Sequence, residues 1–351
     1  MSRFLSKRFS SLVPYVPGEQ PRDRSYIKLN TNESPFPPSP AVIRAATEAA
    51  QRAMLYPDPD MKELREAFSD LYGVDPDEVV FTNGSDDILN FAAMCFCSDE
   101  RPAVFPDVTY GLYKVLCGMN GIPYEEIPLR NDFTVDVSDY LRPGRTVFLA
   151  NPNAPTGILL EPVEIERILN ADPARIVVVD EAYVDFGGKS MIPYIKKYPN
   201  LFVTGTFSKY RSLAGARLGY GVGNRELIRD IDLIRYSTNP YNVNVMSMAC
   251  GIAALKDPGY DRKNGDIIIE NRERLISAMK EMGFVLTDSK ANFVFARHPF
   301  VSGEKIYEEL RARGILVRHF GGERIKDYNR ITIGTAEQTD KLIEALKEIL
   351  S

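Results

Sequence analysis

The 351-residue sequence contains no tryptophan, only two histidines and four cysteines. With His298 and His319 alone, the chain cannot form a histidine-rich metal site, and we expect no bound metal. The cysteines are scattered among apolar residues at spacings that match no zinc site, which indicates reduced core thiols rather than a disulfide framework. They are Cys95, Cys97, Cys117 and Cys250.

A strong excess of one charge and long apolar runs are missing as well. The net charge of −5 provides no basic surface of the kind that binds nucleic acid, so we expect no nucleic-acid partner. No stretch is apolar for long enough to cross a bilayer, and residues 1–13 lack the apolar core of a signal peptide. The sequence therefore predicts a soluble, cytoplasmic protein with no membrane partner.

The composition is that of an ordinary globular protein, with 44% hydrophobic and 26% charged residues. A chain of this length favours about two domains over a single core. Residues 1–39 are rich in proline, which excludes a helix and predicts an ordered arm; a disordered tail is the alternative. We expect a large α/β domain at 40–245 and a smaller α+β domain at 246–351 that packs with the arm.

Strands and helices alternate through the large domain. The predicted strands are 79–81, 103–105, 124–127, 146–150, 176–179 and 201–203; the predicted helices are 41–54, 61–71, one beginning near Ile88, one opening at 109–111 and one from Pro162. This alternation predicts a mostly parallel sheet flanked by helices, with ligands at the carboxyl ends of strands. In the smaller domain we expect helices at 265–282, from Glu304 to Gly314 with Ser302 as cap, and after a Thr335–Gln338 capping box, with strands at 292–296, 315–318 and 330–333.

The most informative stretch is 204–221, which we expect to follow the end of an apolar strand as a hydroxyl-rich turn. It carries Thr206, Ser208 and Lys209, with Arg217 further along. A partly desolvated lysine can act as a Schiff-base nucleophile, and an arginine can hold a phosphate with its planar fork. A surface turn with a solvated lysine is the alternative interpretation.

Gly84, Ser85 and Asp86 lie between a predicted strand and a predicted helix. In such a position, free backbone N–H groups and the helix dipole together bind anions. Plain N-capping of the helix by Ser85 or Asp86 is the alternative.

Asp180, Tyr183 and Tyr110 also follow predicted strands. Asp180 can pair with a protonated ring nitrogen, Tyr183 can hydrogen-bond a ring hydroxyl, and Tyr110 can stack on the ring. One ligand that carries a phosphate, a pyridine nitrogen and an aldehyde would use all of these groups, with Lys209 bound to the aldehyde and later moving a proton.

The chain resembles the fold-type I pyridoxal-phosphate-dependent aminotransferases over nearly its whole length, and within them the histidinol-phosphate aminotransferases. The motifs that carry the resemblance are Pro-Tyr-Val-Pro-Gly-Glu-Gln at 14–20, Lys-Leu-Asn-Thr-Asn-Glu at 28–33, Tyr-Pro-Asp at 56–58, Asn-Gly-Ser-Asp at 83–86, Asn-Pro-Asn-Ala-Pro-Thr-Gly at 151–157, Asp-Glu-Ala-Tyr at 180–183, Thr-Phe-Ser-Lys at 206–209, Val-Arg-His-Phe at 317–320 and Arg-Ile-Thr-Ile-Gly-Thr at 330–335.

The resemblance implies that pyridoxal 5'-phosphate is the cofactor and that the family's catalytic residues are here Lys209, Asp180 and Tyr183. The implied cofactor-binding residues are Gly84, Ser85, Asp86, Tyr110, Asn153, Asp180, Tyr183, Thr206, Ser208, Lys209 and Arg217. It also implies a homodimer in which Tyr56 reaches the cofactor phosphate of the neighbouring subunit. Tyr15, Asn32, Arg318 and Arg330 would face the substrate; a solvated Arg330 at a strand start is the alternative.

The activity that the resemblance implies is transfer of the amino group of L-histidinol phosphate to 2-oxoglutarate, in histidine biosynthesis. The products would be imidazole-acetol phosphate and L-glutamate. An aromatic amino-acid aminotransferase and a threonine-phosphate decarboxylase of the same fold stay open as alternatives. A cofactor-binding protein without activity is disfavoured because Lys209 and Asp180 are both present, and a nicotinamide dehydrogenase because 83–86 lacks the further glycines it would need.

One position departs from the family pattern. Many relatives have an asparagine directly before Pro-Thr-Gly that hydrogen-bonds the ring hydroxyl, whereas this chain has Ala154. The contact is then left to Tyr183 alone or shifts to Asn153, and both readings stay open. The resemblance also suggests a cis bond between Ala154 and Pro155.

Overall fold

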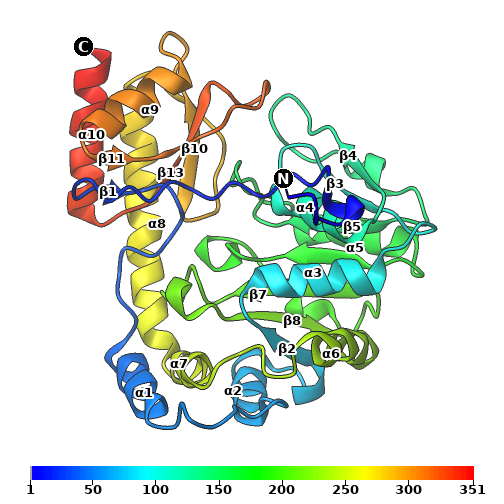
Figure 1. The fold of residues 1–351 in the computed structure, drawn as a ribbon. Helices are drawn as coiled ribbons and strands as arrows, with labels where there is room; N and C mark the ends of the chain where they lie inside the picture. Colours follow the sequence, from blue (N-terminus) through cyan, green and yellow to red (C-terminus); the bar gives the residue numbers. More distant parts are fainter. Residues whose placement is uncertain (1) are drawn as a thin grey trace.

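The computed structural model describes residues 2–351, in which a seven-stranded sheet forms the larger unit (Figure 1). The strand order is β2-β8-β7-β6-β5-β3-β4, and β8 runs antiparallel to its neighbours while the other pairs are parallel. The strands are β2 (Val79–Thr82), β3 (Ala103–Pro106), β4 (Tyr124–Ile127), β5 (Thr146–Ala150), β6 (Val177–Asp180), β7 (Leu201–Thr206) and β8 (Gly219–Gly223). The prediction of a mostly parallel sheet is confirmed.

The sheet has an apolar core on each face. Successive side chains of a strand point to opposite faces, so Val177 and Val179 join one core while Val178 joins the other. The first core also receives side chains from α1 (Pro40–Ala50), α2 (Lys62–Tyr72), α5 (Pro162–Ala171) and α7 (Val245–Lys256), and the second from α3 (Ser85–Phe96), α4 (Leu112–Asn120) and α6 (Arg225–Thr238). Helices therefore flank both faces, as predicted.

The smaller unit is an antiparallel sheet packed against helices. Its strand order is β12-β13-β10-β9, and a separate parallel pair joins β1 to β11. The strands are β1 (Ile27–Lys28), β9 (Val285–Leu286), β10 (Phe293–Arg297), β11 (Ile315–Leu316), β12 (Arg318–His319) and β13 (Tyr328–Thr332); the helices are α8 (Pro258–Glu281), α9 (Gly303–Ala312) and α10 (Ala336–Leu350). The β1–β11 pair ties the N-terminal segment to this unit.

The helix α8 connects the two units. It runs from the side of α1 and α7 towards α9 and α10 (Figure 1). The preceding helix α7 lies in the predicted 246–351 region, yet its Met248 and Leu255 belong to the core of the seven-stranded sheet. The division at residue 245 and the separate 1–39 arm stay predictions.

Several boundaries differ from the sequence predictions. The strand β7 continues through Thr206 instead of ending at 203, because residues 204–206 pair with β8. The helix α3 begins at Ser85 rather than near Ile88, and α8 begins at Pro258 rather than at 265, since proline is well suited to the first turn of a helix.

The helices α6 and α7 and the strand β8 were not predicted, nor were the two-residue strands β1 and β9. By contrast, the Ser302 cap of α9 and the Thr335–Gln338 capping box of α10 are present, and the Ala154–Pro155 bond is cis. Across residues 2–351, no helix is long and apolar enough to cross a membrane.

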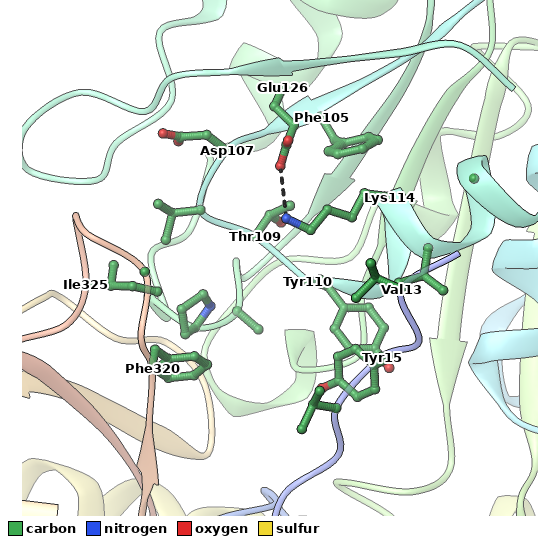
Figure 2. Close-up of a pocket in the computed structure, with 18 of the residues that line it drawn as sticks. Val13, Tyr15, Phe105, Asp107, Thr109, Tyr110, Lys114, Glu126, Phe320 and Ile325 are labelled. Carbon is green, nitrogen blue, oxygen red and sulfur yellow. Dashed lines mark ion pairs between the residues drawn. The ribbon is translucent and has the colours of Figure 1, made fainter. Parts of the chain in front are cut away.

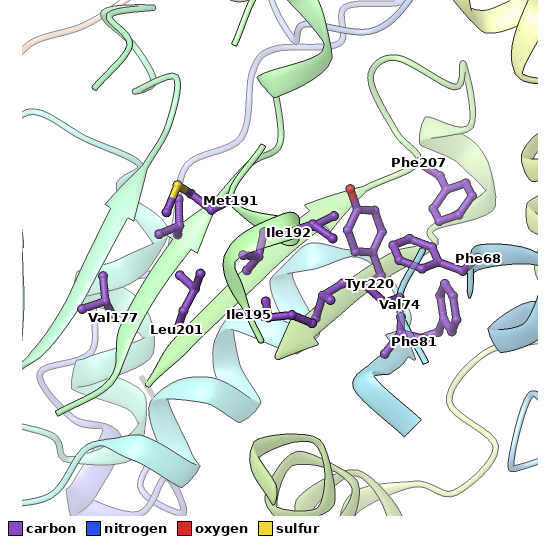
Figure 3. Close-up of a cluster of buried hydrophobic side chains, with 14 of the residues drawn as sticks. Phe68, Val74, Phe81, Val177, Met191, Ile192, Ile195, Leu201, Phe207 and Tyr220 are labelled. Carbon is purple, nitrogen blue, oxygen red and sulfur yellow. The ribbon is translucent and has the colours of Figure 1, made fainter. Parts of the chain in front are cut away.

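An aromatic cluster fills the core under β2 and β8, as Figure 3 shows. Phe68 of α2 is fully buried there and stacks on Tyr72, with the ring centroids 4.3 Å apart. Its ring also lies 4.8 Å from that of Tyr220 and edge-on to Phe81. The cluster fixes α2 against the end of the sheet.

Truncation of this aromatic core should destabilise the fold. We expect Phe68→Ala to lower the free energy of unfolding by about 3–5 kcal/mol, because it removes buried contacts and leaves a cavity. Phe300→Ala is the matched control, since that ring is 91% exposed. Urea denaturation followed by circular dichroism measures both; equal midpoints for the two variants would contradict the packing described.

Candidate active site

The carboxyl ends of β5, β6 and β7 border a cavity of about 390 Å3, a size that suits a small-molecule ligand. The strand register places Ala150 beside Asp180 and Asp180 beside Thr204. Parallel strands thus bring residues that are distant in sequence to one edge of the sheet.

Most of the residues predicted for the site line this cavity. They are Tyr15, Asn32, Ser85, Asp86, Tyr110, Asp180, Tyr183, Thr206, Ser208, Lys209, Arg217, Arg318 and Arg330. Within the described part of the chain, three predicted residues lie outside the lining: Gly84, Asn153 and Tyr56.

Each of these three has a different environment. Gly84 lies directly behind Arg217. The Asn153 amide donates to Val108 O and Thr156 Oγ1 and accepts from Thr109, so its side chain serves the turn rather than the cavity. The Tyr56 ring is 81% exposed and stacks on Tyr241.

Lys209 lies three residues after the end of β7. It lines the cavity together with Thr31 and Asn32 of the N-terminal segment. Its Nζ donates to the backbone oxygen of Thr31 at 3.0 Å. Removal from water and, to a smaller extent, the nearby charge of Arg330 together lower the pKa of Lys209 to about 8, while Glu33 opposes them. A substantial fraction of this amine is therefore neutral, and nucleophilic, at physiological pH.

Asp180 is the last residue of β6 and is buried. Burial raises its pKa to about 6, and hydrogen bonds from Tyr113 Oη at 3.0 Å and from the Ala182 N–H oppose the rise. A buried carboxylate with one oxygen engaged by Tyr113 can pair with a positively charged ring nitrogen that enters the cavity.

An anion-binding corner lies at the start of α3. Among residues 2–351, no side chain caps this helix, whose N-cap is Gly84, so the alternative of plain capping by Ser85 or Asp86 is not observed. Asp86 instead accepts from Arg217 Nη2 at 3.2 Å and from Tyr110 Oη at 2.9 Å. The first-turn N–H groups and the Arg217 guanidinium suit a phosphate.

Two glycines permit the close packing of this corner. Gly84 has φ +90°, and a Cβ there would lie 2.6 Å from Arg217 Nη2. At Gly219, a Cβ would lie 2.4 Å from the backbone of Gly84 and Ser85. Side chains at either position would displace the arginine or the helix start.

The two predicted substrate arginines differ in what they already bind. Arg318 donates to the backbone oxygens of Val16 and Pro17, at 2.9 and 3.1 Å, and so holds the N-terminal segment over the cavity. Arg330 donates to Asn30 O at 3.1 Å, but its buried Nε finds no partner among the described residues. Arg330 therefore keeps donors for an incoming anion.

A second cavity of about 840 Å3 adjoins the first at Tyr15, Tyr110 and Arg330, which line both. Figure 2 shows the rings of Tyr15 and Tyr110 beside each other at its edge, and the Lys114–Glu126 ion pair across it. The two rings meet edge to face with centroids 5.7 Å apart. Both rings therefore belong to the wall of each cavity.

Sequence reasoning missed residues that orient the predicted ones. Tyr113, which donates to Asp180, lies one helical turn after Tyr110, and that spacing was its available signal. Thr332, which contacts Asn32, gave no signal because the contact spans 300 residues. In the described chain, no group of histidine, cysteine and carboxylate side chains could hold a metal ion.

Comparisons with known proteins show similarity to aminotransferases. Residues 24–346 match the family of class I and II aminotransferases. Histidinol-phosphate aminotransferase 1 of Bradyrhizobium diazoefficiens is 45% identical over 350 residues, and the alignment covers 100% of both chains. The histidinol-phosphate aminotransferase of Aromatoleum aromaticum is 45% identical over 355 residues, again with 100% of both chains. The solved structure of histidinol-phosphate aminotransferase from Sinorhizobium meliloti in complex with pyridoxal-5'-phosphate has a TM-score of 0.90 at 26% identity, with 99% of each chain covered.

The environment of Lys209 predicts an unusual pH dependence of its reactivity. Acetylation of Lys209 in ligand-free protein should have its midpoint near pH 8 and fall about tenfold per pH unit below it, because only the neutral amine reacts. Arg330→Gln should move the midpoint upward, since it removes a positive charge that favours the neutral form. Arg313→Gln, at an exposed arginine directly after α9, should leave it unchanged.

Mass-spectrometric quantification of acetylated peptides over a pH series measures these midpoints. A Lys209 midpoint near its ordinary value of 10.5 would contradict the desolvated environment.

Proposed function

This chain belongs to the family of class I and II aminotransferases, and we propose that it transfers the amino group of L-histidinol phosphate to 2-oxoglutarate. The products are imidazole-acetol phosphate and L-glutamate. It is a transaminase that depends on pyridoxal 5'-phosphate. The observation that carries the proposal is that one cavity, the smaller of the two described, brings together three groups. They are a lysine with a lowered pKa, a buried aspartate and an arginine with a donor that has no partner in the described chain.

The residues of the cavity fit pyridoxal phosphate at each of its functional groups. The corner formed by Ser85, Ser208 and Arg217 suits the phosphate, and the two glycines let Arg217 and the start of α3 pack closely there. Asp180 suits the ring nitrogen, and Tyr183 the ring hydroxyl. When bound, the cofactor supplies an electron sink for negative charge at the substrate carbon.

Lys209 would hold the cofactor through the cofactor's aldehyde carbon. With the lysine displaced by the substrate amine, its free Nζ could carry a proton from the substrate carbon to the cofactor carbon, which is general acid–base catalysis. Its lowered pKa favours the proton-accepting form near neutral pH. Tyr110, held by Asp86, covers one face of this region.

Arg330 serves the anionic end of both substrates. Histidinol phosphate brings a phosphate and glutamate a carboxylate, and the planar guanidinium can bind either in turn. Arg318 lies nearby, although two of its N–H groups already bind the N-terminal segment. The segment also contributes Tyr15 to the substrate side of the cavity.

An exposed apolar patch supports the homodimer. Met54, Leu55 and Tyr56 lie together in the connection between α1 and α2, and each is largely exposed. Tyr56 stacks on Tyr241, a second exposed ring. Contiguous exposed apolar side chains of this kind mark protein interfaces. Because Tyr56 does not line the cavity of its own chain, it would reach a cofactor phosphate only in the neighbouring subunit.

The amino donor is tested by half-reactions on the cofactor-loaded protein. Histidinol phosphate and glutamate, each offered alone, should rapidly change the visible absorbance of the bound cofactor, whereas phenylalanine should be slow. Lys209→Ala should lose covalent cofactor attachment after borohydride reduction, as measured by mass spectrometry, because no other amine replaces its Nζ.

Each other outcome has a defined meaning. Rapid conversion by phenylalanine alone would replace the proposal with an aromatic aminotransferase. Release of carbon dioxide from threonine phosphate would indicate a decarboxylase. Covalent attachment that survives in Lys209→Ala would remove Lys209 from its role.

The dimer is tested at the patch. Leu55→Asp should shift the protein from dimer to monomer in light-scattering chromatography and abolish activity, because a charge replaces apolar contact and Tyr56 is withdrawn from the neighbouring site. Phe300→Asp, at another exposed ring, should remain dimeric and active. A dimer that persists in Leu55→Asp would place the interface elsewhere.

A further inference from the structure

We propose that Thr332 and Asn32 are positioning residues that fix the direction of the Tyr183 hydroxyl, so that its hydrogen points into the cavity. The inference rests on the proposed function, because the group that would accept this hydrogen bond is the ring oxygen of pyridoxal phosphate. Asn32 was predicted from the sequence as a substrate contact, and Thr332 was not singled out.

The chain of hydrogen bonds starts at a group that can act in only one direction. The backbone N–H of Asn32 donates to Thr332 Oγ1 at 2.9 Å. A backbone N–H cannot accept, so the threonine oxygen must accept here. The threonine hydroxyl still has its own hydrogen, and the acceptor that faces it is Asn32 Oδ1, also at 2.9 Å.

This contact sets the orientation of the Asn32 amide. With Oδ1 facing Thr332, the amide nitrogen faces Tyr183 and donates to its Oη at 2.9 Å. An amide nitrogen cannot accept, so the tyrosine oxygen accepts. The phenol has one hydrogen, and it must point away from Asn32; Tyr183 lines the cavity, which is where an acceptor can enter.

This chain of hydrogen bonds from Thr332 through Asn32 to Tyr183, called the relay below, is held by buried contacts. Asn32 is 1% exposed, and its backbone oxygen accepts from Asn292 Nδ2 at 3.0 Å. Its φ of +56° lies in the left-handed region, which asparagine tolerates better than most residues. Thr332 is fixed in β13, where it pairs with Phe293, and the Phe293 ring meets that of Tyr183 edge to face.

Neither of the two residues directly before Pro155 offers a competing hydrogen-bond donor. Ala154, on the same side, packs with Phe293 and Tyr183 and carries no polar group. The Asn153 amide is occupied by Val108 and Thr156. Of the two readings that Ala154 left open, the geometry therefore favours Tyr183, with Asn32 behind it.

The electrostatics agree with a hydroxyl that stays protonated. Burial raises the pKa of Tyr183, and the Arg330 charge and the Asn32 hydrogen bond oppose that rise. The phenol keeps its hydrogen near neutral pH and can donate it.

The test is a double-mutant cycle on the full chain, stripped of cofactor and titrated with pyridoxal phosphate. Asn32→Asp keeps the shape and tolerates the left-handed backbone, but it has no N–H, so Tyr183 would turn its hydrogen towards residue 32. We expect the variant to bind the cofactor roughly three- to tenfold more weakly, the range for one hydrogen bond, and to shift the pH profile of the bound cofactor's visible absorbance.

The coupling is what identifies the relay. The effect of Asn32→Asp should vanish in a Tyr183→Phe background and should vanish for a cofactor analogue that lacks the ring hydroxyl. Thr332→Val should reproduce the weakening, and Thr332→Ser, which keeps a hydroxyl, should restore it. Asn292→Ser, which removes a bond to Asn32 outside the relay, should show no coupling to Tyr183.

An equal loss of affinity in the Tyr183→Phe background, or with the analogue, would overturn the proposal and leave Asn32 a structural role. Unchanged cofactor affinity and an unchanged pH profile in Asn32→Asp would overturn it as well. That outcome would not affect the proposed function, which the half-reactions with histidinol phosphate test separately. Failure of the unmodified protein to bind pyridoxal phosphate would overturn both.

Discussion

The parallel pairing of β5, β6 and β7 is the constraint on which the rest of the site depends. The three strands are buried on both faces and end at the same edge of the sheet. The chain must turn there, and the polar residues of the turns therefore lie close together. Asp180 stands at the end of one strand and Thr206 at the end of the next, with Lys209 in the turn beyond. The cavity is lined by residues at the ends of these strands and in the turns that follow them.

Burial at this edge moves the two key ionisable groups in opposite directions. It raises the pKa of Asp180 and lowers that of Lys209, so each group is shifted towards its neutral form. A cofactor with a basic ring nitrogen and an aldehyde would suit both groups: its positive ring nitrogen would favour the ionised form of Asp180, and its aldehyde carbon is the group that a neutral amine attacks. The same desolvation that costs folding free energy therefore prepares the chemistry.

The sequence was enough to predict which residues follow the strands. It was not enough to predict which way their side chains point. Asp180, Lys209 and Arg217 follow from a strand and a turn, which are local features. Asn153 sits in the right turn, but its amide is used by that turn's own backbone and neighbours. The β8, α6 and α7 elements were missed because β8 contains three glycines and because the residues of α6 and α7 gave no clear boundary beyond their asparagine caps.

The N-terminal segment adds a contact to the predicted role of Arg318. Arg318 lines the cavity, yet its bonds go to the backbone oxygens of Val16 and Pro17, which any residues at those positions would offer. Glu19 adds hydrogen bonds from Tyr307 and Arg311 of α9, so the segment is held on both sides of Gly18. A substrate anion that drew Arg318 away would have to compete with those carbonyls, whereas Arg330 offers an Nε with no competing partner in the described chain. We therefore propose different roles for the two arginines: Arg318 positions the segment that carries Tyr15, and Arg330 binds the anion.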